Sequence, residues 1–430
     1  MTTEARATAG VDVAELLGLF PHGTRLADDG VLVVGGCRLD DVAAAYGTPT
    51  YVVAEDALRR QARRLREGLA ARWPRSRVLF ASKSLPARAV YHLMHDEGLG
   101  IDVAGGGELL LALDAGVPGS AIVQHGNAKT DDEIRRAAQA GVGTVVVDGE
   151  GEIGRLEQLG RDGQPVLLRV QPGVDPGTYA GVSTGQRGSK FGVPIEDAPR
   201  LLNRLANSSR LDLRGIHLHL GSQMFGLDPY RKAIDVVSAL GEFDVYDVGG
   251  GLAVRYTFDE HPPSIEEWLD VVTEAARQGL PSGAELWVEP GRACVAESTV
   301  TLYRIVTIKH GSPTFVAVDG GIADNFEAST YIGTRFQATI ATRVGGDELV
   351  DVVGRQCESG DRIAAGVRLQ DPVIGDLVAV PVTGAYTHTL ANNYNGALRA
   401  PVVFCRDGVM TPVVRRDTDA DLLARELAFP

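Results

Sequence analysis

Between residues 77 and 289, short runs of hydrophobic and β-branched residues alternate with longer segments in which apolar residues recur at helical spacing, as in 131–140 and 229–240. Each short run ends in small or polar residues. Eight runs predict strands: 77–80, 100–103, 121–124, 144–147, 166–169, 215–218, 245–248 and 286–289. Because alternating strands and helices indicate a parallel sheet, eight such units predict a closed (β/α)8 barrel of the TIM type.

The pattern changes after about residue 295. Strand-like runs such as 299–303 and 377–380 now follow one another without long helices between them, and 31–34 near the N-terminus has the same character. This favours an all-β domain beside the α/β barrel. The predicted domains are an N-terminal segment that joins the β domain (1–47), a cofactor-binding barrel (48–295) and a C-terminal β domain (296–430).

Composition narrows the possible partners and compartments. The chain has 430 residues, 44% of them hydrophobic, and a net charge of −14, which argues against general binding to nucleic acid or to membrane surfaces. No run of about 18 apolar residues occurs, and the N-terminal residues lack the apolar core of a signal peptide. The four cysteines lie far apart, without metal-ligand spacing. We expect a cytoplasmic protein.

Candidate chemistry lies at the ends of the predicted strands, where barrel enzymes carry their active sites. The first strand ends in Lys83, either a salt-bridged lysine or one that forms a Schiff base. The last two strands end in the glycine-containing clusters 247–251 and 289–292, either simple turns or a phosphate site to which Arg292 adds charge. A reactive lysine and a phosphate site at one barrel mouth suit pyridoxal phosphate.

Two histidines, His217 and His219, point to the same face of the sixth predicted strand. Metal-dependent hydrolases on barrels use such a pair, but they need further ligands, and His125 is the only other histidine at a predicted barrel strand end. An imidazole stacked on a cofactor ring explains one histidine without a metal. We therefore predict no metal site.

Taken together, the motifs resemble the diaminopimelate decarboxylase family, which belongs to the pyridoxal phosphate (PLP) decarboxylases of alanine racemase-like fold. The resemblance extends over roughly residues 30–420. The motifs that carry it are 80–83, 102–108, 125–129, 189–192, 217–223, 249–251, 289–292, 319–321, 357–361 and 384–386.

The resemblance implies roles for these residues that agree with their chemistry. Lys83 would bind PLP covalently, and His219 would stack on its ring. Glu289 would face the pyridine nitrogen and keep it protonated, which favours decarboxylation over racemisation. The residues implied around the phosphate are Ser222, Gly249, Gly250, Gly251, Gly291, Arg292 and Tyr386.

The resemblance also implies a homodimer with shared active sites. Cys357 and Glu358 would reach the site of the neighbouring subunit, where Cys357 is the candidate acid that reprotonates the α-carbon. Glu358 would help to bind the distal end of the substrate. The predicted substrate contacts are Arg292, Glu327, Tyr331, Glu358 and Tyr386.

One position departs from the family pattern. Glu327 takes the place of the arginine that pairs with the distal carboxylate of diaminopimelate, although Arg335 is a possible offset substitute. A glutamate there repels a carboxylate. The default substrate is meso-diaminopimelate or a close relative, converted to L-lysine and CO2.

Several alternatives to this function stay open. The first is a modified amino acid or one bound to a carrier protein. The arginines of a predicted helix, which otherwise form a solvated face, would then dock an acidic carrier: Arg59, Arg60, Arg63, Arg64 and Arg66. An amino-acid racemase is disfavoured by Glu289, and a non-catalytic PLP-binding protein by Cys357 and Glu358. A metal hydrolase is the remaining alternative.

Overall fold

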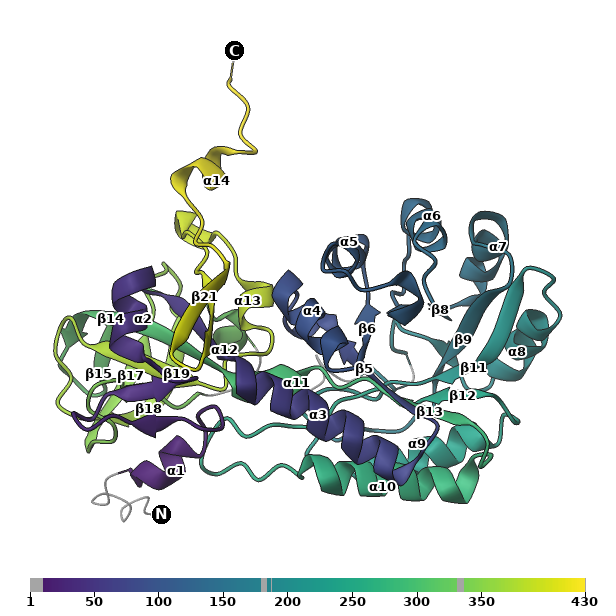
Figure 1. Ribbon diagram of the computed structural model, residues 1–430, viewed down its shortest axis with the longest axis horizontal. Coiled ribbons are helices and arrows are strands. Elements are labelled where there is room, and N and C mark those ends of the chain that lie inside the picture. Colours follow the sequence, from purple (N-terminus) through teal and green to yellow (C-terminus); the bar gives the residue numbers. More distant parts are fainter. Residues whose placement is uncertain (1–10, 179–183, 187, 331–335, 430) are drawn as a thin grey trace. The chain divides into compact units, whose positions relative to one another are not determined.

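The computed structural model describes residues 11–178, 184–186, 188–330 and 336–429 (Figure 1). The chain divides into two compact units. We call Arg59–Val254 with Pro262–Cys294 the barrel unit, and Met1–Leu58 with Arg255–His261 and Val295–Pro430 the β unit. Each is described by itself.

The barrel unit contains the eight predicted parallel strands. They are β5 (Ser76–Ala81), β6 (Gly100–Val103), β7 (Ile122–Gln124), β8 (Thr144–Val147), β9 (Gln164–Gln171), β11 (Leu211–His217), β12 (Val245–Asp247) and β13 (Glu285–Val288). Each strand pairs with the next, and β13 pairs with β5, so the sheet closes into a ring. The short β10 (Val193–Pro194) adds to β9. The predicted (β/α)8 barrel is confirmed.

Helices lie outside the ring of strands (Figure 1), and the residues that they bury are mostly apolar. In α6, Thr130 and Glu133 form a capping box, and Ile134 and Ala137 are buried. The helices of this layer are α3 (Glu55–Arg72), α4 (Arg88–Asp96), α5 (Gly106–Asp114), α6 (Asp131–Gln139), α7 (Glu150–Leu159), α8 (Ala198–Ala206), α9 (Asp228–Ser238) and α10 (Ile265–Gly279). Among the helices that the structure describes, none is long and apolar enough to cross a membrane.

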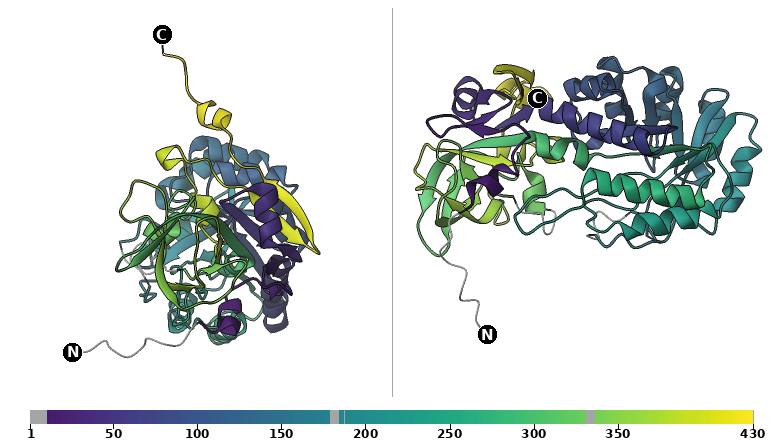
Figure 2. Two further views of the ribbon diagram at one scale, coloured as in Figure 1. Left: turned by 90° about the vertical axis from the view of Figure 1, so that its left-hand side faces the viewer. Right: turned by 60° about the horizontal axis from the view of Figure 1, so that its bottom comes forward.

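The β unit is built on a mixed sheet that the N-terminal part of the chain completes. Strand β4 (Thr50–Ala54) pairs antiparallel with β14 (Thr299–Lys309) and parallel with β20 (Val402–Arg406). Figure 2 shows these segments from the two ends of the chain, purple and yellow, side by side. The predicted contribution of the N-terminal part to this domain is confirmed. Because β4 follows residue 47, the β unit extends further along the chain than the predicted segment.

The remaining strands of the β unit extend this sheet or lie beside it. They are β15 (Thr314–Val318), β16 (Thr339–Ile340), β17 (Glu348–Val353), β18 (Arg362–Leu369), β19 (Leu377–Pro381) and β21 (Val409–Val414), with β1 (Arg25–Leu26), β2 (Leu32–Val34) and β3 (Cys37–Arg38) in a separate small sheet. The short helices of this unit are α1 (Val13–Leu17), α2 (Leu39–Tyr46), α12 (Phe326–Thr330), α13 (Thr387–Leu390) and α14 (Asp419–Leu423), and α11 (Arg292–Val295) lies where the chain passes from the barrel unit to the β unit.

Candidate active site

The turn that follows β5 presents Lys83. Ser82 and Ser84 are fully buried, and the Ser84 hydroxyl donates a hydrogen bond to the Ala81 carbonyl at 2.9 Å. Lys83 lies between these two anchors, and its side chain is exposed. The positive charge of Lys83 acts on two titratable groups from other strands of the barrel, Asp102 on β6 and His219 after β11. The ε-amino group is therefore accessible at the carboxyl end of the barrel.

A buried carboxylate, Glu289, lies at the end of β13 and is held by two histidines. Nε2 of His125 lies 2.7 Å from one carboxylate oxygen, and Nε2 of His217 lies 3.0 Å from the other. The Glu289 side chain is only 5% exposed. Asp102 lies 3.6 Å from the same nitrogen of His125. Four strands, β6, β7, β11 and β13, thus bring these groups to one point inside the barrel.

The charges in this cluster follow from its contacts. Burial alone would raise the pKa of Glu289, but His125 and His217 outweigh burial and hold the pKa well below its usual range. Burial would likewise lower the pKa of His125, but Asp102 and Glu289 outweigh it and raise the pKa. For His217, burial prevails and lowers the pKa to about 4. Glu289 is therefore ionised beside one charged and one neutral imidazole.

Two neighbouring groups are kept neutral. Burial, reinforced by the Glu289 charge, raises the pKa of Asp247 well above its usual range. Burial, reinforced by the charges of Lys83 and Arg169, lowers the pKa of His219 well below its usual range. The Gly250 amide donates a hydrogen bond to Nδ1 of His219 at 3.2 Å, which places the ring proton on Nε2. A neutral imidazole of fixed orientation suits stacking on a cofactor ring.

The loop after β12 requires its glycines. Gly249 and Gly251 have φ values of 68° and 114°, and a Cβ on Gly250 would collide with the Glu289 carbonyl. The Gln223 amide bonds both backbone groups of Val254, at 2.8 and 3.1 Å, so the loops after β11 and β12 are tied together. The Gly249 amide donates to the Asp247 carboxyl at 2.9 Å, so the glycine loop is fixed in place, and a bulky side chain would block its surface.

A positive charge and a hydroxyl complete the surroundings of the glycine loop. The Arg292 guanidinium lies 3.4 Å from the Ser222 hydroxyl, and the Arg292 residue is 7% exposed. Gly291 lies against the carboxyl end of β5. A Cβ atom added to Gly291 would lie 3.1 Å from the Cβ atom of Ala81. An accessible lysine, an ionised carboxylate, a neutral imidazole and an anion-binding loop fit PLP.

The donor atoms of His125, His217 and Glu289 lie within 4.8 Å of one another, which is also compact enough for a metal ion. However, both histidines use Nε2 to contact the carboxylate directly. Within the described residues, Nδ1 of His217 has no hydrogen-bond partner, whereas metal-binding histidines usually donate through their second nitrogen. The arrangement therefore favours a carboxylate clamp.

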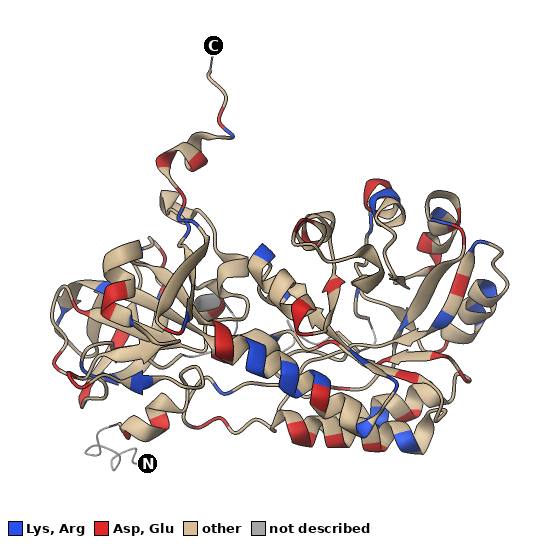
Figure 3. Ribbon diagram, viewed as in Figure 1, with Lys and Arg blue, Asp and Glu red and all other residues tan. Residues whose placement is uncertain are grey.

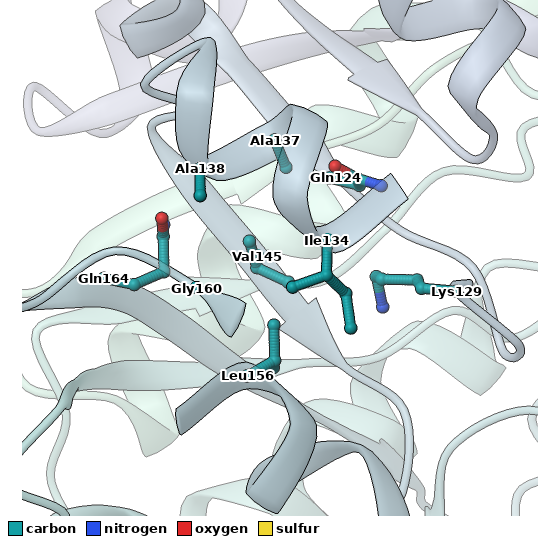
Figure 4. A pocket seen from close by; sticks show the side chains of 9 residues that line it. All are labelled: Gln124, Lys129, Ile134, Ala137, Ala138, Val145, Leu156, Gly160 and Gln164. Carbon is teal, nitrogen blue, oxygen red and sulfur yellow. The ribbon is translucent and has the colours of Figure 1, made fainter. Parts of the chain in front are cut away.

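Lys129, the lysine of the motif 125–129, is not suited to bind the cofactor covalently. Its ammonium group lies 2.7 Å from Glu152 and donates to the Gly126 and Val146 carbonyls. Figure 4 shows Lys129 at the edge of a small cavity beside Gln124. The cavity volume is about 10 Å³, enough for roughly one water molecule. The cofactor does not fit there.

In the β unit, a loop presents Cys357 and Glu358. Asp361 fixes the loop by accepting hydrogen bonds from the Ile322 amide at 2.6 Å and the Gln356 amide at 2.8 Å. Cys357 is exposed as a free thiol. Glu358 lines an open pocket of about 420 Å³, together with Ile322, Phe326, Asn392 and Tyr394. The pocket is wide enough for an amino-acid side chain.

The other predicted residues of the β unit lie near this loop or outside the described chain. Glu327 follows the pocket residue Phe326 on α12 and is 1% exposed. Tyr386 begins α13 in the left-handed conformation, with φ 63°, a backbone state that is often found at functional sites. Tyr331 and Arg335 lie outside the described residues.

The arginine-rich face of α3 is neutralised by acidic side chains of the barrel unit. Arg59 lies 2.8 Å from both Asp96 and Glu97, Arg63 lies 2.8 Å from Glu97, and Arg64 lies 2.7 Å from Glu266. Figure 3 shows blue and red segments interspersed along α3 and its neighbours. This pairing favours a solvated helix face over a docking surface for an acidic carrier.

Comparison with known proteins identifies the class of the barrel. Residues 55–296 match the family model described as "Pyridoxal-dependent decarboxylase, pyridoxal binding domain". The chain is thus a PLP-dependent carboxy-lyase. The predicted cofactor and enzyme class are confirmed.

The particular family follows from full-length relatives. The chain is 43% identical over 424 residues to a diaminopimelate decarboxylase of Actinosynnema pretiosum subsp. auranticum, which covers 95% of each chain. It is 36% identical to that of Bacillus subtilis (strain 168), over 96% of this chain and 99% of the relative. The crystal structure of the M. jannaschii diaminopimelate decarboxylase in complex with L-lysine matches with a TM-score of 0.88 and 28% identity, over 95% of this chain and 99% of that chain. The chain belongs to the diaminopimelate decarboxylase family.

Sequence reasoning missed the clamp on Glu289. The sequence pattern points to His125 and His217 only as metal ligands, and it indicates no role for Asp102 or Asp247. Each of these residues lies at the carboxyl end of a predicted strand, which was the available signal.

Proposed function

We propose that the protein removes the α-carboxylate of meso-diaminopimelate or a close relative, releasing CO2 and L-lysine or its counterpart. The observation that carries this proposal is the ionised Glu289 in the same barrel end as the accessible Lys83. The names of the relatives support the substrate class. In this proposal, the barrel region 48–295, apart from β4, binds PLP, and 1–47 and 296–430 together with β4 form the β domain. The enzyme is cytoplasmic, in keeping with its free thiols.

In the proposed site, Lys83 holds the cofactor and releases it to the amino group of the substrate. When bound, PLP supplies an electron-withdrawing ring that takes up the electron pair of the breaking Cα–C bond. His219 supports one face of that ring. The phosphate-binding residues are Ser222, Gly249, Gly250, Gly251, Gly291, Arg292 and Tyr386. No metal takes part.

Glu289 directs the reaction toward decarboxylation. Its negative charge keeps the ring nitrogen protonated, and a protonated ring withdraws electrons most strongly. An arginine in its place would weaken this effect and favour racemisation. The low pKa of Glu289, which is due to His125 and His217 outweighing burial, supports this role.

In this proposal, the protein is a homodimer in which each active site contains residues from both subunits. Cys357 would donate the proton that replaces CO2 on the α-carbon, because it is an exposed thiol on a fixed loop. The proposed substrate contacts are Arg292, Glu327, Tyr331, Glu358 and Tyr386, and the pocket beside Glu358 would receive the distal end.

Shared sites predict complementation between inactive variants. Lys83→Ala and Cys357→Ala subunits each lack one half of a site, so a hybrid dimer contains one intact site. An equal mixture should recover about 25% of wild-type activity, since half of the dimers are hybrids with one working site of two. CO2 release would be measured after subunit exchange is verified by mass spectrometry. Exchange without recovery would contradict a shared site.

Substrate choice is expected to depend on Glu327. If its charge faces the distal carboxylate of meso-diaminopimelate, Glu327→Arg should raise kcat/KM for that substrate about 10-fold, which corresponds to roughly 1.4 kcal/mol. Glu327→Gln, which keeps the volume but removes the charge, should give a smaller gain. The measurement is steady-state CO2 release by both variants and by Arg335→Ala. Efficient wild-type turnover that is lost in Arg335→Ala and unchanged in Glu327→Arg would assign the carboxylate to Arg335.

The proposed function is tested by CO2 release from a panel of free amino acids that includes meso-diaminopimelate, with and without an acidic carrier protein. Turnover of free meso-diaminopimelate or a close relative is expected. Turnover only of carrier-bound amino acids would instead support the carrier-dependent alternative. The ion pairs of the α3 arginines argue against that result.

A further inference from the structure

The clamp on Glu289 is asymmetric. His125 and His217 contact different oxygens of this carboxylate and lie edge to face, with ring centroids 4.8 Å apart. In the part of the chain that the structure describes, His125 has a second carboxylate nearby, Asp102 at 3.6 Å, whereas the one carboxylate paired with His217 is Glu289. The shorter contact to Glu289, at 2.7 Å, also belongs to His125. Geometry and charge therefore place the single positive charge of the clamp on His125.

The groups that face His125 come from every neighbouring strand end. They are Asp102 on β6, Arg169 on β9, His217 on β11 and Glu289 after β13. Beyond them, Lys83 after β5 acts on Asp102, and Asp247 on β12 interacts with both carboxylates. Burial and the Glu289 charge keep Asp247 protonated, because they raise its pKa well above the usual range. Of the carboxylates among the described residues, Glu289 therefore makes the closest contact with the imidazole, at 2.7 Å.

A protonated ring nitrogen brings a second positive charge to this carboxylate. In a buried site, two adjacent positive charges disfavour each other strongly. Asp102, at 3.6 Å, is too distant to replace the 2.7 Å contact between Glu289 and His125. The outcome of lowest free energy is that the His125 imidazole loses its proton when the ring nitrogen binds.

We propose that His125 is a positioning residue that holds a proton opposite Glu289 only while the ring nitrogen of the cofactor is absent. This inference rests on the proposed contact between Glu289 and that nitrogen. On binding, the Nε2–H bond of His125 breaks and its electron pair stays on Nε2. The proton goes to solvent when the ring nitrogen arrives protonated, and to the ring nitrogen when it arrives unprotonated.

This proton exchange explains how Glu289 stays able to pair with a protonated ring. Without His125, burial would favour the neutral acid form of Glu289, which is unable to pair with a protonated ring. With His125, the carboxylate is ionised in both states, and the total positive charge beside it stays at one. His217 keeps its hydrogen bond throughout and fixes the orientation of the carboxylate.

The test compares two ligands that lack the aldehyde and therefore do not react with Lys83. Pyridoxine 5′-phosphate has the ring nitrogen, and its 1-deaza analogue has a C–H group in its place. The imidazole signals of the nine histidines are followed by NMR as a function of pH, and His125 is assigned with His125→Gln. His92→Gln, at an exposed position of α4, is the matched control variant.

In the cofactor-free protein, His125 should titrate above the usual range of histidine. Pyridoxine 5′-phosphate should lower its proton affinity at least tenfold, and the deaza analogue should not. At a pH where the free ligand carries a protonated ring nitrogen, calorimetry in buffers of different ionisation enthalpy should show the wild type releasing about one more proton with pyridoxine 5′-phosphate than with the deaza analogue. This second measurement needs no variant. Identical titration of His125 with and without pyridoxine 5′-phosphate would overturn the inference.

Binding to Glu289→Gln separates the proposed contact from the proton exchange. If Glu289 does not face the ring nitrogen, both ligands should bind equally well to the wild type and to Glu289→Gln, which contradicts the proposed site. If pyridoxine 5′-phosphate binds more tightly than the deaza analogue and Glu289→Gln removes the difference, the proposed contact holds. An unchanged His125 titration in that case would reject the proton exchange alone.

Discussion

Replacing Lys83 by alanine should reduce decarboxylation by about 10⁴-fold or more, because the amine that holds the cofactor and exchanges it with the substrate is lost. The buried serines on either side hold the turn, and Lys83 itself is exposed, so the fold should persist. Activity is measured as CO2 release at saturating PLP. Lys232→Ala, an exposed lysine on α9, is the matched control and should keep wild-type activity.

The same assignment is checked by covalent labelling. The wild-type protein with bound PLP should be yellow, and borohydride reduction should fix the cofactor to the peptide that contains Lys83. Lys129 is the informative competitor, because its ammonium group is buried between Glu152 and two backbone carbonyls. A label on Lys129 or any other lysine would show that the site is assigned incorrectly.

The second large effect is expected for Glu289→Gln, which should lower kcat by about 10²- to 10³-fold. The glutamine has nearly the same shape but no charge, so the ring nitrogen loses the group that keeps it protonated in the transition state. The pKa of Glu289 is held well below its usual range because His125 and His217 outweigh burial. The carboxylate is thus already ionised throughout the working pH range, and the loss should not depend on pH between about 6 and 9.

Glu285→Gln provides the control for this variant, because it makes the same substitution at the other end of β13. Its carboxylate contacts the Trp287 indole at 2.9 Å and Arg75 at 3.6 Å, away from the cofactor-binding end of the strand. CO2 release by this variant should stay close to the wild-type value. A Glu289→Gln enzyme within threefold of wild type would contradict the role given to Glu289.

The sequence by itself determined the barrel and the positions of its main groups. Strands such as 77–80 and 286–289 are short and apolar and are separated by helical segments, so their number, order and direction follow from local patterns. Parallel strands place all their carboxyl ends on one side. This is why Lys83, His219, Gly249–Gly251 and Glu289 were expected at one barrel mouth before any contact was known.

The tertiary structure alone decided how these groups act on one another. His125, His217 and Glu289 are separated by long stretches of chain, and only barrel closure brings them within hydrogen-bonding distance. No local pattern encodes which oxygen meets which imidazole. The protonation states depend on this geometry, because burial and neighbouring charges act in opposite directions on each group.

The same limit explains the other differences between sequence and structure. The sequence leaves open whether Arg59 and Arg64 belong to a solvated face or to a docking surface, because their acidic partners Glu97 and Glu266 lie far along the chain. Strand β4 follows the predicted N-terminal segment, yet its hydrogen bonds with β14 and β20 place it in the sheet of the β unit. Local sequence determines what a segment is, and long-range contacts determine which segments and charges it meets, because those contacts form only when the chain closes on itself.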